Sequence, residues 1–292
     1  MDWSNKLNYL KISTLKFLIN QGFNCPNCGN SKNKIIKRKY FVTTLRECQK
    51  CFLLFRAPTT TTEENKKFYQ EKYSIGYATD CPNEEELKKL IDTNFNNTER
   101  SYKKYIEILK LMHQDKNPKL LDFGCSWGYG SYQLSKSGFD IESYEISESR
   151  SRYAKEMLNV KIIDNLNSIE DEYFDIFFSS HVLEHLPNLN YILNLALRII
   201  KKNGLFIAFT PNGSFFHKNK NSHWNKLWGM VHPNFLNEKF YKNYFKDYKH
   251  YISSQPYSID SIKNFINGDQ NFCDNLEGEE LLIIVKNKQL LS

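Results

Sequence analysis

The sequence lacks a long uninterrupted apolar run. Its longest mostly apolar stretches, such as residues 191–200, are broken by Asn194 and Arg198 and fall far short of the ~20 residues that span a bilayer. Residues 1–22 carry leucines among lysines and asparagines, without the continuous apolar core and small-residue cleavage site of a secretory signal. We therefore expect a soluble, cytoplasmic protein that begins with an amphipathic helix over residues 1–22.

A strong imbalance of charge is absent as well. The chain has 40 basic and 33 acidic residues, a net charge of +7 over 292 residues, which is mild for a dedicated nucleic-acid binder. The densest basic stretch, residues 32–39, could meet phosphates, but we favour a solvated face. Apolar residues are not scarce: they make up 40% of the chain, with 21 Phe and 18 Tyr, which excludes global disorder.

Cysteine is sparse, but four of the 7 residues form two CxxC pairs, Cys25 with Cys28 and Cys48 with Cys51. Two such turns at the ends of a hairpin direct four thiolates at one point, which is the arrangement of a structural zinc site with a complete coordination sphere. The residues between the pairs have strand-like composition. We predict a zinc ribbon over residues 23–58, against the alternative of four unliganded cysteines, and assign the zinc no catalytic role.

The remaining chain divides into two parts. Residues 59–115 carry apolar side chains at helical spacing and are expected to form a helical linker or lid. Residues 116–292 alternate strand-like and helical patterns, with candidate strands at 119–123, 140–146, 160–163, 174–180, 205–209, 248–253 and 280–285. This alternation predicts an α/β fold with a mostly parallel, doubly wound sheet.

A glycine-rich turn follows the first of these strands. Residues 120–130 read Leu-Leu-Asp-Phe-Gly-Cys-Ser-Trp-Gly-Tyr-Gly, and such a turn between strand and helix lets the backbone approach a nucleoside. It is not the dinucleotide fingerprint, because Ser126 and Tyr129 stand where glycine is needed. No Gly-Lys-Ser/Thr completes a P-loop either.

This motif resembles that of the class I S-adenosylmethionine-dependent methyltransferases, an apolar strand followed by Asp/Glu-x-Gly-x-Gly-x-Gly. Residues 144–147 with Glu145, residues 174–187 and residues 209–212 are similar to that family in the same order. The resemblance implies a Rossmann-like seven-stranded sheet and S-adenosylmethionine as cofactor, with Glu145 on the ribose and Ile146 on the adenine. The cofactor site it implies comprises Asp122, Phe123, Gly124, Cys125, Ser126, Gly128, Tyr129, Gly130, Glu145, Ile146, Asn165, Leu166 and Ser180.

The N-terminal part carries a resemblance of its own. The cysteine pairs, residues 52–58 and the pattern of Phe68, Tyr69 and Tyr73 are similar to bacterial methyltransferases with an N-terminal zinc-binding module. Many of these act in surface-polysaccharide or secondary-metabolite sugar pathways. The resemblance therefore implies methyl transfer to an oxygen of a saccharide or other small metabolite.

A histidine-rich string follows the fourth strand. Transfer to a hydroxyl needs a group that takes its proton, and His181 and His185 are the catalytic candidates. The string resembles the ExxEH metal site of certain quinone-pathway and small-RNA ribose O-methyltransferases, with His181 in place of the first Glu. That implies a second divalent metal at His181, Glu184, His185 and His232. The alternative is a histidine that packs near the cofactor without a metal.

Residues 215–233 are expected to form a lid over the acceptor pocket, because loops at the carboxyl ends of parallel strands commonly bind the ligand. Trp224, Trp228 and His232 are its candidate substrate contacts. The same tryptophans fit a small satellite core equally well.

Two other functions stay open. The first is an RNA methyltransferase whose ribbon grips RNA, which the modest net charge disfavours. The second is a non-catalytic binding protein on the same fold, suggested by Ser126 and Trp127 in the cofactor turn, because a Trp127 that filled the methionine pocket would prevent cofactor binding.

Overall fold

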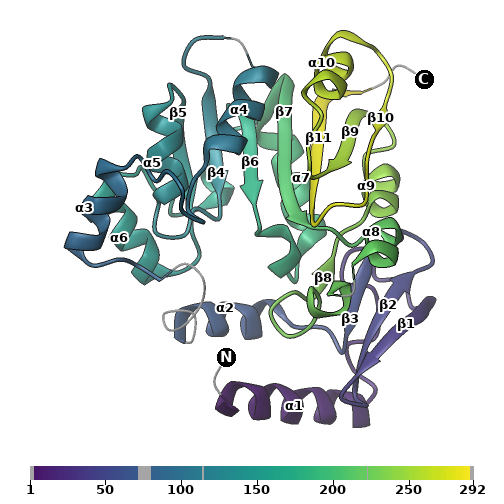
Figure 1. Ribbon diagram of the computed structural model, residues 1–292. Helices are drawn as coiled ribbons and strands as arrows, with labels where there is room; N and C mark the ends of the chain where they lie inside the picture. The colour runs from purple at the N-terminus through teal and green to yellow at the C-terminus, as the bar shows by residue number, and fades with distance from the viewer. Residues whose placement is uncertain (1–2, 72–79, 114, 222, 290–292) are drawn as a thin grey trace.

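The computed structural model describes residues 3–71, 80–113, 115–221 and 223–289. Its centre is a seven-stranded sheet in the order β10-β9-β11-β7-β6-β4-β5 (Figure 1). The strands are β4 (Lys119–Phe123), β5 (Asp140–Tyr144), β6 (Phe174–Ser180), β7 (Ile200–Pro211), β9 (Tyr248–Ser254), β10 (Phe272–Cys273) and β11 (Glu280–Gln289). β4 to β7 run parallel, whereas β11 lies antiparallel between β7 and β9. The predicted α/β methyltransferase sheet is confirmed.

Helices cover both faces of this sheet because its central strands are apolar on both sides. On one face α4 (Lys103–Met112), α5 (Tyr129–Lys136) and α10 (Ile259–Asn267) contribute Ile108, Leu134 and Ile262 to the core. On the other face α7 (Leu189–Ile199) and α9 (Glu238–Tyr244) contribute Leu193 and Phe240. The sheet is therefore doubly wound, as the alternation of patterns predicts.

The strand predicted at 160–163 does not form. The structure has a single bridge there, between Ser143 and Ile162. The amide of Ser143 donates to the carbonyl of Lys161, and the carbonyl of Ser143 accepts from the amide of Ile163. Val160 is instead buried in a satellite core beside α6 (Glu148–Leu158) and α3 (Glu84–Asp92), and the chain then turns into a short 3-10 helix at Leu166–Ser168. The seventh strand is β10, which pairs with β9 through two residues and carries no strong sequence signal.

The four-cysteine segment forms a second, four-stranded sheet in the order β1-β2-β3-β8. It consists of β1 (Asn33–Lys39), β2 (Thr43–Cys48), β3 (Leu54–Ala57) and β8 (Asn234–Phe235). The predicted hairpin is the β1–β2 pair. β8 comes from a distant part of the chain, so this small sheet is joined to the larger domain by main-chain hydrogen bonds and by a shared core.

Two helices lie below the carboxyl ends of the parallel strands, α1 (Trp3–Leu18) and α2 (Thr62–Glu71) (Figure 1). The chain between β7 and β8 contains α8 (Phe215–Lys220) and returns over the same edge. Among the described residues, no helix combines the length and the apolar character that crossing a bilayer requires.

Candidate cofactor cavity and metal-ligating cluster

A cavity of about 580 Å³ opens at the carboxyl ends of β4, β5 and β6, between these strand ends and α2. This is the edge at which parallel α/β sheets bind ligands. Most residues predicted for the cofactor site line it, namely Phe123, Gly124, Ser126, Tyr129, Glu145, Ile146, Asn165, Leu166 and Ser180. Four others, Asp122, Cys125, Gly128 and Gly130, do not line it.

The turn after β4 needs its glycines for shape. Gly124 has φ +84°, and a Cβ there would lie 2.3 Å from a methyl carbon of Val182. The amide of Ser126 donates to Oε2 of Glu145 at 2.9 Å, and its hydroxyl accepts from the Arg150 guanidinium at 2.6 Å. These contacts fix the conformation of the turn.

Asp122 lies beneath this turn. It is buried, and its Oδ2 accepts a 2.6 Å hydrogen bond from the Ser131 hydroxyl. Burial raises the pKa of Asp122 to about 7, although the Ser131 hydrogen bond lowers it. Asp122 therefore supports the turn from beneath and is not among the residues that line the cavity.

Trp127, the unusual residue of the turn, points away from the cavity. Its ring is buried in the satellite core with Phe95, Ala154 and Leu158. Trp127 therefore does not fill the cavity in which the methionine part of the cofactor is expected. The position of Trp127 thus gives no support to a non-catalytic protein.

The sequence does not predict the aromatic side chains in the walls of the cavity. Tyr69, Tyr102, Tyr144 and Tyr191 line the cavity from four separate segments. Of the pattern of Phe68, Tyr69 and Tyr73 noted in the sequence, Tyr73 lies outside the described residues. No local signal separates a cavity tyrosine from a core tyrosine, because both occur at the same helical spacing.

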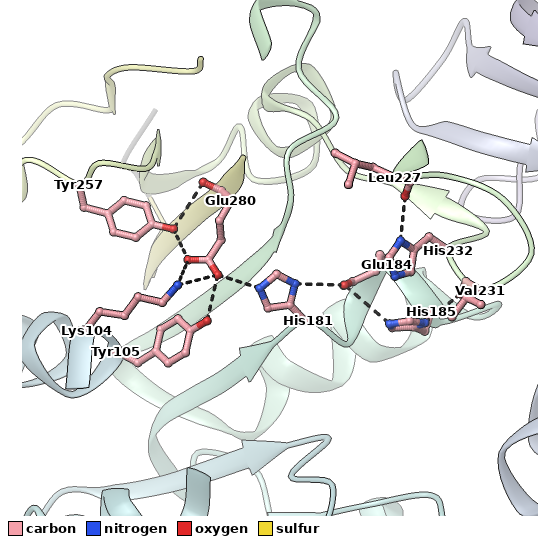
Figure 2. Close-up of polar contacts among 10 residues, drawn as sticks. All are labelled: Lys104, Tyr105, His181, Glu184, His185, Leu227, Val231, His232, Tyr257 and Glu280. Atoms are coloured by element: carbon pink, nitrogen blue, oxygen red, sulfur yellow. Dashed lines mark hydrogen bonds and ion pairs between the residues drawn. The ribbon is translucent and has the colours of Figure 1, made fainter. Parts of the chain in front are cut away.

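A cluster of ionisable side chains closes one end of the cavity (Figure 2). The ligand atoms of Glu184, His185 and His232 all lie within 4.8 Å of one another. The Nδ1 atoms of the two histidines point to backbone carbonyls, that of His185 to Val231 at 2.8 Å and that of His232 to Leu227 at 2.8 Å. A carbonyl only accepts, so each Nδ1 carries a proton and each Nε2 is the ring nitrogen that could ligate a metal.

Glu184 is buried, and among the described residues neither of its carboxylate oxygens has a hydrogen-bond partner. Its Oε1 lies 3.6 Å from His181 Nδ1 and 3.7 Å from His185 Nε2, so an ion pair with His181 compensates part of a charge that is costly to bury. Burial lowers the pKa of His185 to about 4, so the imidazole of His185 is neutral at pH 7. The donor set of one carboxylate and two oriented imidazoles fits a divalent cation such as zinc or manganese.

His181 is not among the three residues whose ligand atoms all lie within 4.8 Å of one another, so its part in the predicted four-residue metal site stays a prediction. Its Nε2 is 2.7 Å from Oε2 of Glu280, and its Nδ1 is 3.6 Å from Oε1 of Glu184 (Figure 2). Against the effect of burial, these two carboxylates raise the pKa of His181. The ring still lines the cavity.

The four predicted zinc ligands also converge. The Sγ atoms of Cys25 and Cys51 are 3.5 Å apart, as are those of Cys28 and Cys48, and all four lie within 4.8 Å of one another. Tetrahedral zinc with ~2.3 Å bonds to sulfur needs sulfur atoms about 3.8 Å apart. The amides of Lys50 and Cys51 point at the Sγ of Cys48, as they do toward a thiolate ligand. The site fits zinc.

The tryptophans of the expected lid are buried. Trp224 and Trp228 pack with Leu45, Leu54 and Phe235 between the small sheet and the segment that carries His232. Neither tryptophan lines the candidate cofactor cavity. Of the two interpretations that the sequence left open, substrate contact and satellite core, the burial of both tryptophans fits the satellite core. His232, the third member of that prediction, does line it.

Comparison with known proteins agrees with this geometry. The profile of a family described as a methyltransferase domain matches residues 96–251, which is more than half of the chain. The chain therefore belongs to this methyltransferase family, and its sheet is of the class I, S-adenosylmethionine-dependent type.

Individual relatives are distant. A ubiquinone biosynthesis O-methyltransferase of Rickettsia akari is 36% identical over 103 residues, 32% of this chain and 40% of that protein. Its namesake from Pelagibacter ubique is 24% identical over 131 residues, 41% of this chain and 55% of that protein. The chain thus spans about half the length of these curated relatives. Among solved structures, the plantazolicin methyltransferase BpumL in complex with SAH has a TM-score of 0.49 at 15% identity, covering 77% of this chain and 96% of that one.

Proposed function

We propose that the chain transfers a methyl group from S-adenosylmethionine to a hydroxyl oxygen of a saccharide or another small metabolite. The observation that carries this proposal is the cluster of Glu184, His185 and His232, whose two histidines line the same cavity as the glycine-rich turn. That arrangement places groups able to assist loss of a hydroxyl proton beside the expected donor site. The O-methyltransferase names of the relatives support an oxygen acceptor.

The donor site would be formed by side chains from three strand ends. Glu145 presents its carboxylate to the ribose hydroxyls while its own position is fixed by two backbone amides. Ile146 and Leu166 supply apolar faces for the adenine, and Asn165 borders it. When bound, S-adenosylmethionine supplies a methyl group on a sulfonium, which is already activated, so the protein chiefly orients donor and acceptor and excludes water.

Glu184, His185 and His232 would hold a divalent cation, which favours ionisation of an acceptor hydroxyl. The buried carboxylate, which accepts no hydrogen bond from the described residues, and the two oriented imidazoles are the features that support it. Without a cation, the neutral His185 is the residue best placed to take the proton. His181 borders the same space from the other side of Glu184.

Polar and aromatic walls support a saccharide-like acceptor. Tyr69 and Tyr191 offer ring faces, while Asn65 and Asn188 offer amide groups that suit hydroxyls. Asn65, Tyr69 and Val231 also line a neighbouring cavity of about 610 Å³ beneath α1 and α2, which gives room for the part of an acceptor remote from the methylated oxygen. The four-cysteine zinc site would be structural and would hold β3 and β8 in register beside it.

The test is methyl transfer from labelled S-adenosylmethionine to separate panels of sugar nucleotides, catechols and RNA. We expect label in the sugar-nucleotide panel, loss of the rate in His185→Ala, and no change in the affinity for S-adenosylhomocysteine in that variant. Label in RNA alone would overturn the acceptor class. Absence of S-adenosylhomocysteine binding by calorimetry would overturn the enzymatic proposal altogether.

A further inference from the structure

Arg56 is a buried arginine near the end of β3, with 3% of its surface exposed. A guanidinium carries several N–H donors, yet among the described residues this one makes a single hydrogen bond, from Nη2 to the Thr60 hydroxyl. Its Nε is buried and has no partner in the described part of the chain. Its Cζ lies 5.2 Å from the centre of the Tyr9 ring. Most of the donor capacity of Arg56 is therefore unused.

The charge of Arg56 is not compensated either. Among the described residues, no carboxylate lies within ion-pair distance of its guanidinium. Glu64 lines the same cavity, but its Oε2 is 2.6 Å from Nζ of Lys16 and is thus paired already. Lys67 adds a further positive charge to the wall. Because a buried charge without a counterion is costly, the surroundings of Arg56 favour an anion in this cavity.

The cavity that Arg56 lines is the one of about 610 Å³ beside α1 and α2, the two neighbouring helices at the bottom of Figure 1. It adjoins the candidate cofactor cavity through Asn65 and Tyr69, which line both. The Asn65 amide donates to the carbonyl of His185 at 2.9 Å, and the rings of Tyr69 and His185 are 6.2 Å apart. An acceptor with a hydroxyl beside His185 can therefore extend toward Arg56.

We propose that Arg56, with Thr60 and Lys67, binds a phosphate group of the methyl acceptor, which is then a phosphate or diphosphate ester of the saccharide. The inference deepens the proposed function and rests on it. Arg56 and Lys67 supply two positive charges beyond the Lys16–Glu64 pair, which matches the charge of about −2 on a phosphate monoester. The planar guanidinium also fits two phosphate oxygens at once, and the Thr60 hydroxyl can donate to a third.

The test uses inorganic pyrophosphate as the probe, titrated into the full chain by calorimetry in about 0.15 M salt. Arg56→Met keeps an unbranched side chain and removes the charge. Arg38→Met is the matched control, because Arg38 is an exposed arginine of the same small sheet that does not line the cavity. Circular dichroism checks that each variant is folded. Lys67→Met serves as a second variant, since Lys67 is exposed and its replacement should not disturb the fold.

We expect the wild type to bind one equivalent of pyrophosphate. Arg56→Met should weaken this binding about tenfold, because charge-assisted hydrogen bonds from a buried group are lost. Lys67→Met should weaken it about threefold, and Arg38→Met should not change it. UDP-glucose should displace pyrophosphate, whereas glucose and glucuronate should not. With a phosphorylated acceptor, Arg56→Met should raise KM about tenfold and leave kcat unchanged, because the contact is remote from the reacting atoms.

Several results would overturn the inference and leave the proposed function standing. They are a wild type that binds S-adenosylhomocysteine but no pyrophosphate, an unchanged affinity for pyrophosphate in folded Arg56→Met or in Lys67→Met, and displacement by glucuronate in place of UDP-glucose. Equal rates of methyl transfer to a neutral saccharide and to its phosphorylated form would do the same. A chain that binds pyrophosphate through Arg56 but neither binds S-adenosylhomocysteine nor methylates any acceptor would instead overturn the proposed function.

Discussion

The amide of Ser126 donates a 2.9 Å hydrogen bond to Oε2 of Glu145. The second carboxylate oxygen accepts from the amide of Ser147 at 2.8 Å. One side chain thus joins the turn after β4 to the turn after β5, the two segments that face the expected nucleoside. The proposed ribose contact and the shape of the glycine-rich turn therefore depend on the same carboxylate.

Replacing this carboxylate by an amide should weaken cofactor binding. In Glu145→Gln we expect the affinity for S-adenosylhomocysteine to fall at least tenfold, about 1.4 kcal/mol, because charge-assisted hydrogen bonds are lost. Glu142→Gln is the matched control, since Glu142 lies on β5 just before Glu145 but pairs with Lys161 and Tyr173, away from the cavity. Titration calorimetry measures both, and an equal effect of the two variants would argue against a ribose contact.

Gly124 should tolerate no side chain. Gly124→Ala adds a methyl 2.3 Å from Val182 on top of a φ of +84°, so we expect loss of both folding stability and cofactor affinity. Gly138→Ala isolates the backbone effect, because Gly138 has φ +97° and open space around it. It should lower the free energy of unfolding by only about 1 kcal/mol. Chemical denaturation measures the free energy of unfolding of both variants. A similar decrease in both would show that the Val182 side chain moves to make room for the added methyl group.

Stability should depend on pH through Asp122. Its pKa is raised from 3.8 to about 7 in the folded chain, so folding favours the protonated form. The free energy of unfolding, measured relative to Asp122→Asn, should fall as the pH rises from about 4 to 7, by at most about 1.4 kcal/mol per pH unit. Denaturant titrations of both proteins across this range test it, and a constant difference would contradict the raised pKa.

Loss of one cysteine ligand should release zinc. Cys25→Ser is expected to abolish the one equivalent of zinc per chain and to destabilise the fold by several kcal/mol, a part of the ~10 kcal/mol that structural zinc sites supply. Cys273→Ser is the control, because Cys273 is exposed and far along the chain. Elemental analysis and thermal unfolding give the readouts. Full zinc content in Cys25→Ser would remove Cys25 from the site.

Periodic and closely spaced features were predictable from the sequence. The alternation of strand-like and helical segments predicted the doubly wound sheet, and the hairpin between the cysteine pairs appears as β1 and β2. The prediction failed at 160–163, where a short apolar run was expected to pair as a strand. That run is instead divided between one bridge to Ser143 and the burial of Val160 against α6.

The sequence by itself determined the spacing of four thiols, the order of the strands along the chain and the residues of the glycine-rich turn, because each depends on neighbours a few positions away. Only the tertiary structure decided that Trp224 is core, that Trp127 turns away from the cavity, and that His181 pairs with Glu280. Those two residues are 99 positions apart, and they meet because β11 inserts antiparallel between β7 and β9. Such a contact is set by the packing of whole strands, which no local pattern of residues specifies.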